Sequence, residues 1–229
     1  MIIGHQPLIR DLKALADERK LSHGYIFFGS RRIGKKCVAL GLANYLETGE
    51  FSPNLKNQPL SDALVIGPDE QKSIGIDKIR DIKNFLWQMP NRSAYRTVIV
   101  DDCIHLTDEA QNALLKITEE PPASGLVILV VEDPESLRPT LQSRLEKIYF
   151  APVAAKEIEK WLVTAGRTSP DQAREISQSA LGAPGLAWAF IYDERFGEMQ
   201  KLAKKFLATP VTGRRLFLKD LVADEHFNL

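Results

Sequence analysis

The sequence predicts an α/β protein in which helices cover both faces of a mostly parallel sheet, followed by a smaller part made of helices alone. Two observations predict this architecture. Five short, continuously apolar segments alternate with helical patterns up to about residue 150, which is typical of strands buried on both sides. After Pro152 the strand pattern disappears and only helical spacing remains.

The elements of the first hundred residues follow from apolar spacing. Apolar residues three and four apart predict helices, and short apolar runs bounded by glycine, proline or polar residues predict strands. The expected order is helix 6–20, strand 25–28, helix 35–46, loop 48–61, strand 63–66, helix 76–88 and strand 97–100. Pro90 ends the third helix, because the residue before a proline is pushed out of the helical region.

The third strand leads directly into Asp101 and Asp102. Thr107 is the expected N-cap of the next helix, with two acids in its positively polarised first turn. That helix must stop before the pair Pro121-Pro122. Two further strands are expected at 126–131 and 147–150.

The helical part divides into two domains. Helices are expected at 154–165, 170–180 and 185–196, and residues 197–229 are helical as well. The predicted organisation is a sheet domain over 1–152, a small helical domain over 153–195 and the beginning of a further helical domain over 196–229. Two helices cannot bury their apolar faces alone, so we expect these last helices to continue into a larger domain or to pack on a partner.

Composition limits the classes of function. The chain has 229 residues, with 30 Lys plus Arg against 30 Asp plus Glu. This balance excludes a protein that binds polyanions through bulk charge. Two local basic clusters remain, Arg31, Arg32, Lys35 and Lys36 in one and Lys201, Lys204 and Lys205 in the other. Such clusters are typical of solvated faces, although in a ring they could line a DNA channel.

The two cysteines indicate a reducing compartment. Cys37 and Cys103 lie among apolar neighbours and are expected to be buried free thiols, too few for a disulfide framework. No apolar run approaches the ~20 residues of a membrane span, and the first residues lack the features of a signal peptide. We therefore expect a cytoplasmic protein that does not enter a membrane.

The string at 29–36 has the form of a phosphate-binding P-loop with one substitution. Gly29 and Gly34 would let backbone N–H groups curl around a phosphate, and Lys35 would reach the outer phosphates. Lys36 stands where a serine or threonine hydroxyl normally ligates Mg²⁺, and an ammonium cannot ligate a cation. The alternative is a loop that keeps the turn but holds no nucleotide.

Asp101 and Asp102 are the candidate acids at the end of a strand. In a P-loop ATPase, Asp101 would hold the Mg²⁺ shell, and Asp102 would stand where a glutamate usually orients the attacking water. The aspartate is one methylene shorter, and a misplacement of about 1 Å can cost ~100-fold in rate. The alternative is a pair of acids that are solvated or cap a turn.

Arg144 lies just before the fifth strand, in Ser143-Arg144-Leu145. Its guanidinium could project from the domain edge into a neighbour's phosphate site, where a planar fork matches the charge of a phosphoryl transition state. From residue types alone, an arginine at such an edge more often forms a surface salt bridge.

Several strings together resemble AAA+ clamp-loader subunits, most closely the delta-prime subunits of bacterial DNA polymerase III. The resemblance covers about residues 3–195. Its most specific part is Asn-Ala-Leu-Leu-Lys at 112–116 with Glu-Glu-Pro-Pro at 119–122, and the other matching strings are 23–29, 34–36, 74–80, 106–111, 137–144 and 182–185.

The resemblance implies an AAA+ domain, a small helical lid and the start of a helical collar that assembles a five-subunit ring. The partners implied are gamma/tau-type and delta-type subunits, with the sliding clamp and primer-template DNA reached through the complex. Delta-prime subunits generally do not hydrolyse ATP. They lend the arginine of a Ser-Arg-Cys motif to the ATP and Mg²⁺ site of a neighbour, and Arg144 matches it, although Leu145 replaces the cysteine.

Departures from the family pattern favour an inactive site. Many members carry a four-cysteine zinc module, but residues 47–62 contain no cysteine, so we expect no zinc and no tightly bound cofactor. Val131 replaces the sensor threonine or asparagine after the fourth strand, and Leu186 stands where active lids carry an arginine. With Lys36 and Asp102, each departure removes a different part of the ATPase apparatus.

Two other functions stay open at this point. One is a gamma-type subunit or another DNA-linked AAA+ protein that hydrolyses ATP, for which Lys36 is the discriminating residue. The other is a free-standing nucleic-acid module, which would bind DNA with a strong dependence on salt.

Overall fold

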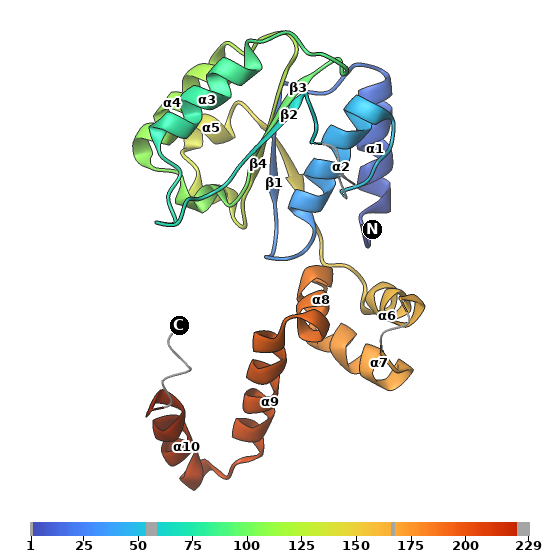
Figure 1. Cartoon of the computed structure of the whole chain (residues 1–229), viewed down its shortest axis with the longest axis vertical. Coiled ribbons are helices and arrows are strands. Elements are labelled where there is room, and N and C mark those ends of the chain that lie inside the picture. The colour runs from blue at the N-terminus through green and yellow to red at the C-terminus, as the bar shows by residue number, and fades with distance from the viewer. Residues whose placement is uncertain (1, 54–58, 166–167, 224–229) are drawn as a thin grey trace. The chain divides into compact units, whose positions relative to one another are not determined.

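The computed structural model describes residues 2–53, 59–165 and 168–223. The chain forms two compact units, 1–184 and 185–229. The first unit contains a five-stranded sheet with the strand order β2-β3-β4-β1-β5, and every neighbouring pair is parallel (Figure 1). The predicted parallel sheet is confirmed. The domain boundaries at 152 and 195 stay predictions.

The elements of the first unit follow the predicted order closely. The strands are β1 (Gly24–Phe28), β2 (Ala63–Ile66), β3 (Arg96–Val100), β4 (Gly125–Val130) and β5 (Glu146–Tyr149). The helices are α1 (Gln6–Asp17), α2 (Lys35–Thr48), α3 (Ile76–Leu86), α4 (Asp108–Glu119), α5 (Pro139–Gln142), α6 (Ala155–Thr164) and α7 (Pro170–Ser179). Short 3-10 turns at Cys103–His105 and Pro134–Ser136, like α5, have too few residues to show a helical period in the sequence.

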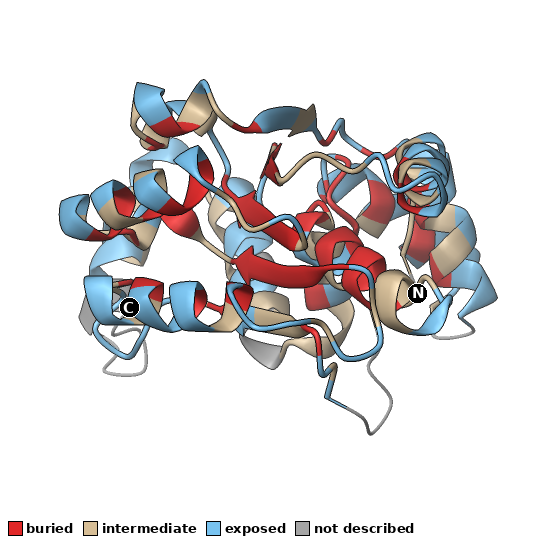
Figure 2. Ribbon diagram, turned by 90° about the horizontal axis from the view of Figure 1, so that it is seen from above, coloured by how far each residue is buried: buried red, intermediate tan, exposed pale blue. Residues whose placement is uncertain are grey.

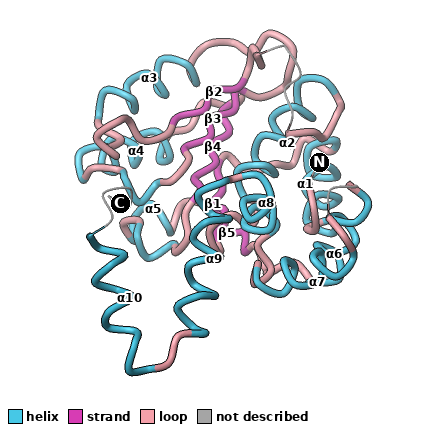
Figure 3. Tube along the Cα trace, turned by 60° about the horizontal axis from the view of Figure 1, so that its bottom comes forward, coloured by secondary structure: helices cyan, strands magenta, loops and turns pink. Residues whose placement is uncertain are grey.

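The sheet is buried on both faces because its strands alternate between two apolar cores. On β1, Tyr25 and Phe27 join one core while Ile26 joins the other. Helices α1 and α2 cover the first of these faces, and α3, α4 and α5 cover the second (Figure 3). The strands appear as a largely buried centre in Figure 2. This two-sided burial explains why the strand segments are continuously apolar.

Parallel pairing gives the sheet two chemically different edges. The carboxyl ends of β1, β3 and β4 lie at one edge, which we call the carboxyl edge, and the residues that follow these strands gather there. The amino ends of the strands form the opposite edge, the amino edge, where Arg144 precedes β5. The length of β1, five residues, separates the two edges by about 16 Å at ~3.3 Å per residue.

A buried ion pair ties the amino edge together. Asp62 accepts hydrogen bonds from the backbone N–H groups of residues 91, 92 and 93 at 2.8, 2.6 and 2.9 Å, and lies 3.3 Å from Nη1 of Arg96. Arg96 also packs on the ring of Phe85. Burial acts to raise the pKa of Asp62, but these N–H groups and Arg96 outweigh it and hold that pKa below its usual value.

The second unit contains α8 from Gly185 onward (Pro184–Tyr192), α9 (Glu194–Ala208) and α10 (Val211–Ala223). The single helix predicted over 185–196 is wrong, because the chain breaks at Asp193 and a new helix begins at Glu194. Phe206 and Phe217 pair their rings between α9 and α10, 5.9 Å apart. The prediction that both cysteines are buried is also wrong for Cys37, which is exposed on α2, whereas Cys103 is fully buried.

The first helix is shorter than its pattern predicted. It ends at Asp17 rather than at residue 20, because Arg19 adopts a left-handed backbone conformation with φ 55°. Among the described residues, no helix has both the length and the apolar character needed to cross a lipid bilayer.

Candidate functional site

The P-loop turn lies at the carboxyl edge, between β1 and α2. Gly29 has φ +138°, and a Cβ at this position would lie 2.6 Å from the carbonyl oxygen of Phe150. Gly34 has φ +117° and is the N-cap residue of α2. Only glycine adopts these conformations without strain, so the two glycines of the sequence motif build the turn.

The side chain of Lys35 is buried within the turn and hydrogen-bonded to it. Its ammonium donates to the carbonyl oxygens of Gly29 and of Ser30, the latter at 2.7 Å, and only 7% of the residue is exposed. Burial lowers the pKa of Lys35, although Glu132, Asp101 and Asp102 act in the opposite direction. The side chain that would reach an outer phosphate is thus bound to the loop's own backbone.

Lys36 reaches across the carboxyl edge to the candidate acid. Its Nζ lies 2.8 Å from Oδ2 of Asp101, which directly follows β3. The lysine side chain is half exposed and the aspartate side chain about one quarter exposed. An ammonium therefore stands beside the carboxylate that would hold part of a Mg²⁺ shell.

The other two carboxylates at this edge are paired with a third cation. Arg31 lies 3.7 Å from Asp102 and makes a closer ion pair with Glu132, which follows β4. His105 lies 3.5 Å from the same Asp102. Each of the three acids at this edge, Asp101, Asp102 and Glu132, therefore lies in an ion pair with a basic side chain of the same chain.

This donor set does not fit Mg²⁺. A hard divalent cation needs oxygen ligands, but position 36 offers an ammonium and Asp101 is already ion-paired with it. Within residues 2–53, 59–165 and 168–223, no group of three histidine, cysteine, aspartate or glutamate residues could hold a metal ion. The carboxyl edge thus has the backbone turn of a P-loop, with an ammonium at the position of the usual hydroxyl ligand.

Arg144 lies at the amino edge, away from the P-loop of its own chain. Its Nη1 donates to the carbonyl oxygen of Thr140 and its Nη2 to Oε1 of Glu119, each at 2.7 Å. The side chain remains 34% exposed. The length of the strands therefore lies between this guanidinium and the P-loop of the same chain.

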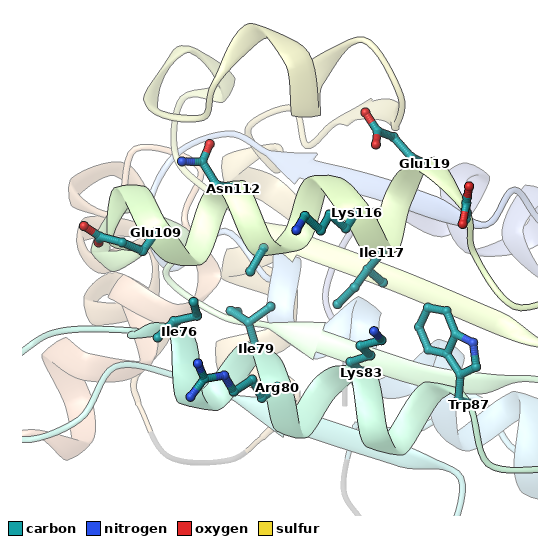
Figure 4. A pocket seen from close by; sticks show the side chains of 12 residues that line it. Ile76, Ile79, Arg80, Lys83, Trp87, Glu109, Asn112, Lys116, Ile117 and Glu119 are labelled. Carbon is teal, nitrogen blue, oxygen red and sulfur yellow. The ribbon is translucent and has the colours of Figure 1, made fainter.

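A groove between α3 and α4 borders the same edge (Figure 4). It encloses about 640 Å³, with an apolar floor that includes Ile79 and Ile117. Arg80, Lys83 and Lys116 line its length. Glu119, the partner of Arg144, lies at the end of the groove where α4 stops.

The structure brings together most of the residues that the sequence singled out. Gly29, Gly34, Lys35, Lys36, Asp101 and Asp102 meet at the carboxyl edge, whereas Arg144 stands apart at the amino edge. Sequence reasoning missed Glu119 as the partner of Arg144, and it grouped Arg31 with solvated basic residues. The adjacent glutamates before the double proline were visible as a motif, but nothing in the sequence linked them to residue 144.

The strand order and the turn between β1 and α2 together define an α/β protein with a P-loop fold. Among solved structures, a DNA polymerase III gamma-subunit-related protein of Thermotoga maritima matches with a TM-score of 0.55 and 23% identity, over 91% of this chain and 76% of that one. The Holliday junction branch migration motor RuvB of the same organism matches with a TM-score of 0.60 and 14% identity, over 96% and 70% of the two chains. At these identities the likeness shows the fold alone.

Residues 4–154 match the family described as DNA polymerase III, delta subunit, and the chain belongs to this family. The delta-prime subunit of Escherichia coli DNA polymerase III is 31% identical over 62% of this chain, and that of Pseudomonas aeruginosa is 29% identical over 72%. The tau subunit of Bacillus subtilis is 29% identical over 69%. The matched parts span 43%, 53% and 30% of these relatives' own lengths.

Proposed function

We propose that this chain is a clamp-loader subunit of the replicative DNA polymerase III holoenzyme, which does not hydrolyse ATP itself and supplies Arg144 to the ATP site of a neighbouring subunit. The observation that carries the proposal is the separation of the guanidinium from its own P-loop by the length of the sheet. An arginine so placed can complete a phosphate site only in another chain.

The charge pairs at the carboxyl edge support the absence of hydrolysis. Lys36 takes the place of the hydroxyl ligand and neutralises Asp101, while Arg31 forms ion pairs with Glu132 and, at a longer distance, with Asp102. Positioning and electrostatic stabilisation supply almost all of the catalysis in phosphoryl transfer, and the metal ion contributes to both. A site in which these carboxylates are ion-paired and the hydroxyl ligand is missing would therefore lose an important contribution to rate.

The proposed chemistry is electrostatic. As negative charge spreads over the transferring phosphoryl group in the neighbour's site, the planar fork of Arg144 would donate to its oxygens. Arginine fingers supplied by another chain are worth roughly 10³–10⁵ in rate. ATP and Mg²⁺ would be bound by the neighbour.

The partners in this proposal are gamma/tau-type and delta-type subunits in a pentameric ring. The sliding clamp and primer-template DNA would be engaged through the complex, in the cytoplasm. The names of the related subunits support this assignment.

The test is Arg144→Ala in a loader reconstituted with its ATP-hydrolysing subunits. We expect the DNA-stimulated ATPase rate at the adjoining site to fall by about 10³-fold and clamp loading to fall with it. Arg10→Ala on the exposed part of α1 is the matched control and should leave both unchanged. An unaltered rate in the Arg144 variant would remove the proposal.

The second candidate is an ATP-hydrolysing gamma-type subunit, which the match to the Bacillus subtilis tau subunit favours. It predicts Mg²⁺-dependent nucleotide binding and turnover by the purified chain. Titration with a fluorescent ATP analogue, with and without Mg²⁺, separates the two candidates.

A further inference from the structure

Arg144 is held by two elements that come from different parts of the sheet domain. Thr140, in the short helix α5, offers its backbone carbonyl, and Glu119, the last residue of α4, offers its carboxylate. The hydroxyl of Ser143 lies 3.5 Å from Nη1. These contacts fix the guanidinium from two sides.

The backbone on each side of Arg144 is anchored in the core. Leu141 is fully buried and Leu145 is 6% exposed, and both belong to the apolar cluster under α3 and α4. Burial of these two leucines leaves the chain between them little freedom. The direction in which Arg144 leaves the backbone is thus set by packing, and only the side-chain torsions remain to be fixed.

Glu119 fixes those torsions from an electrostatically unusual position. It lies at the carboxyl end of α4, where the helix dipole disfavours a negative charge. The double proline that follows at 121–122 prevents the helix from extending, so the glutamate is kept at this end. The positive charge of Arg144 offsets this unfavourable interaction, which favours the ion pair between the two side chains.

The pair leaves Arg144 able to bind a further anion. A guanidinium carries five N–H groups, and the contacts to Thr140, Ser143 and Glu119 use at most three of them. Two remain for phosphate oxygens. A preorganised fork loses little freedom when such oxygens arrive, and a displacement of about 1 Å in a reacting geometry can cost ~100-fold in rate.

We infer that Glu119 is the positioning residue for Arg144: it holds the guanidinium in the geometry in which it meets the neighbour's nucleotide. This inference rests on the proposed function of Arg144. Glu119 itself touches no reacting group.

The experiment compares three variants in the reconstituted loader. We expect Glu119→Ala to lower kcat of the adjoining ATP site at least about 10-fold with KM unchanged, because the lost contact matters only when the fork meets the transition state. Glu119→Gln keeps an acceptor oxygen and should recover most of the rate. Glu120→Gln changes the neighbouring exposed glutamate and serves as the matched control.

A double variant separates positioning from a general effect on the subunit. If Glu119 acts through Arg144, Glu119→Ala should cause no further loss in an Arg144→Ala background. Equal losses in both backgrounds, or a faster rate in Glu119→Ala alone, would overturn the inference.

The variants distinguish a failure of the role proposed for Arg144 from a failure of the role inferred for Glu119. If Arg144→Ala leaves the ATPase rate unchanged, the proposed function is wrong. If Arg144→Ala abolishes the stimulated rate but Glu119→Ala behaves as wild type, only the role of Glu119 is wrong.

Discussion

The Nζ atom of Lys36 lies 2.8 Å from Oδ2 of Asp101, so an ammonium stands beside the carboxylate that would share a Mg²⁺ ion in an active P-loop protein. The two residues are brought together by the parallel sheet, although β4 lies between the strands that precede them. A lysine at position 36 thus offers no ligand to a metal ion and also pairs with the acid beside it.

Replacing this lysine should restore a dependence on the metal. In Lys36→Thr, the hydroxyl supplies a ligand and Asp101 loses its ammonium partner, so we expect Mg²⁺ to tighten binding of a fluorescent ATP analogue by about 10-fold or more. In the wild-type chain, Mg²⁺ should have little effect. Lys20→Thr, outside the P-loop, is the control. Mg²⁺-tightened binding by the wild type would contradict this reading of Lys36.

Loss of the buried carboxylate at the amino edge should destabilise the fold strongly. Asp62→Asn replaces one acceptor oxygen with an NH₂ donor, so at least one of the three N–H bonds is lost and Arg96 is left buried without its counter-charge. We therefore expect a loss of about 3 kcal/mol in the free energy of unfolding at pH 7. Urea denaturation measures it. Asp11→Asn, on the exposed side of α1, should change stability by less than about 0.5 kcal/mol.

The same residue gives a pH dependence of defined sign. Because the pKa of Asp62 is lower in the folded state than in the unfolded state, its carboxylate stabilises the fold fully above the unfolded pKa of about 4. This stabilisation is lost as the pH falls through the folded pKa. The stability difference between wild type and Asp62→Asn should therefore shrink below about pH 4, and a difference that stays constant would rule out this origin.

The N-cap of α4 should contribute a smaller but measurable part of the free energy of unfolding. The hydroxyl of Thr107 accepts from the backbone N–H of Ala110 at 3.2 Å, so Thr107→Ala should cost about 1 kcal/mol in the free energy of unfolding. Thr107→Ser keeps the acceptor oxygen, so its free energy of unfolding should lie within about 0.3 kcal/mol of the wild-type value. Equal losses in both variants would indicate that the methyl group, not the cap, matters.

The two thiols should differ in reactivity. Cys103 is fully buried, its Sγ lies 3.1 Å from the carbonyl oxygen of Val100, and burial raises its pKa. Cys37 is exposed, although partial burial of its sulfur raises its pKa as well. A chromogenic thiol reagent should modify one cysteine per native chain, faster as the pH rises, and two in urea. Cys37→Ser should abolish the native reaction, whereas a persisting reaction would place the accessible thiol elsewhere.

Much of the fold could be predicted because its strands are buried on both faces. Continuous apolar runs such as 97–100 and 126–131 have no other common explanation between helical segments, and their bounds agree with β3 and β4 to within one residue. The cap at Thr107 is confirmed for a similar reason, since the signal is local. The break at Asp193 was missed, because the helical spacing continues on both sides of it.

The ion pairs between residues far apart in the chain could not be predicted from the sequence. Arg144 and Glu119 are 25 positions apart, and both lie at the amino edge only because α4 runs back along the sheet. Asp62 and Arg96 offered a clearer signal, since each stands at the beginning of one of two parallel neighbouring strands. Recognising that pair requires the strand order, which the sequence does not state.

Helix α4 starts near the acids of the carboxyl edge and ends at Glu119, which accepts a hydrogen bond from Arg144. At its starting edge, lysine and arginine side chains of the same chain already form ion pairs with the acids. Under the proposed function, this charge balance would be the same at every stage of clamp loading, and the timing of each cycle would come from the ATP-hydrolysing chains of the assembly.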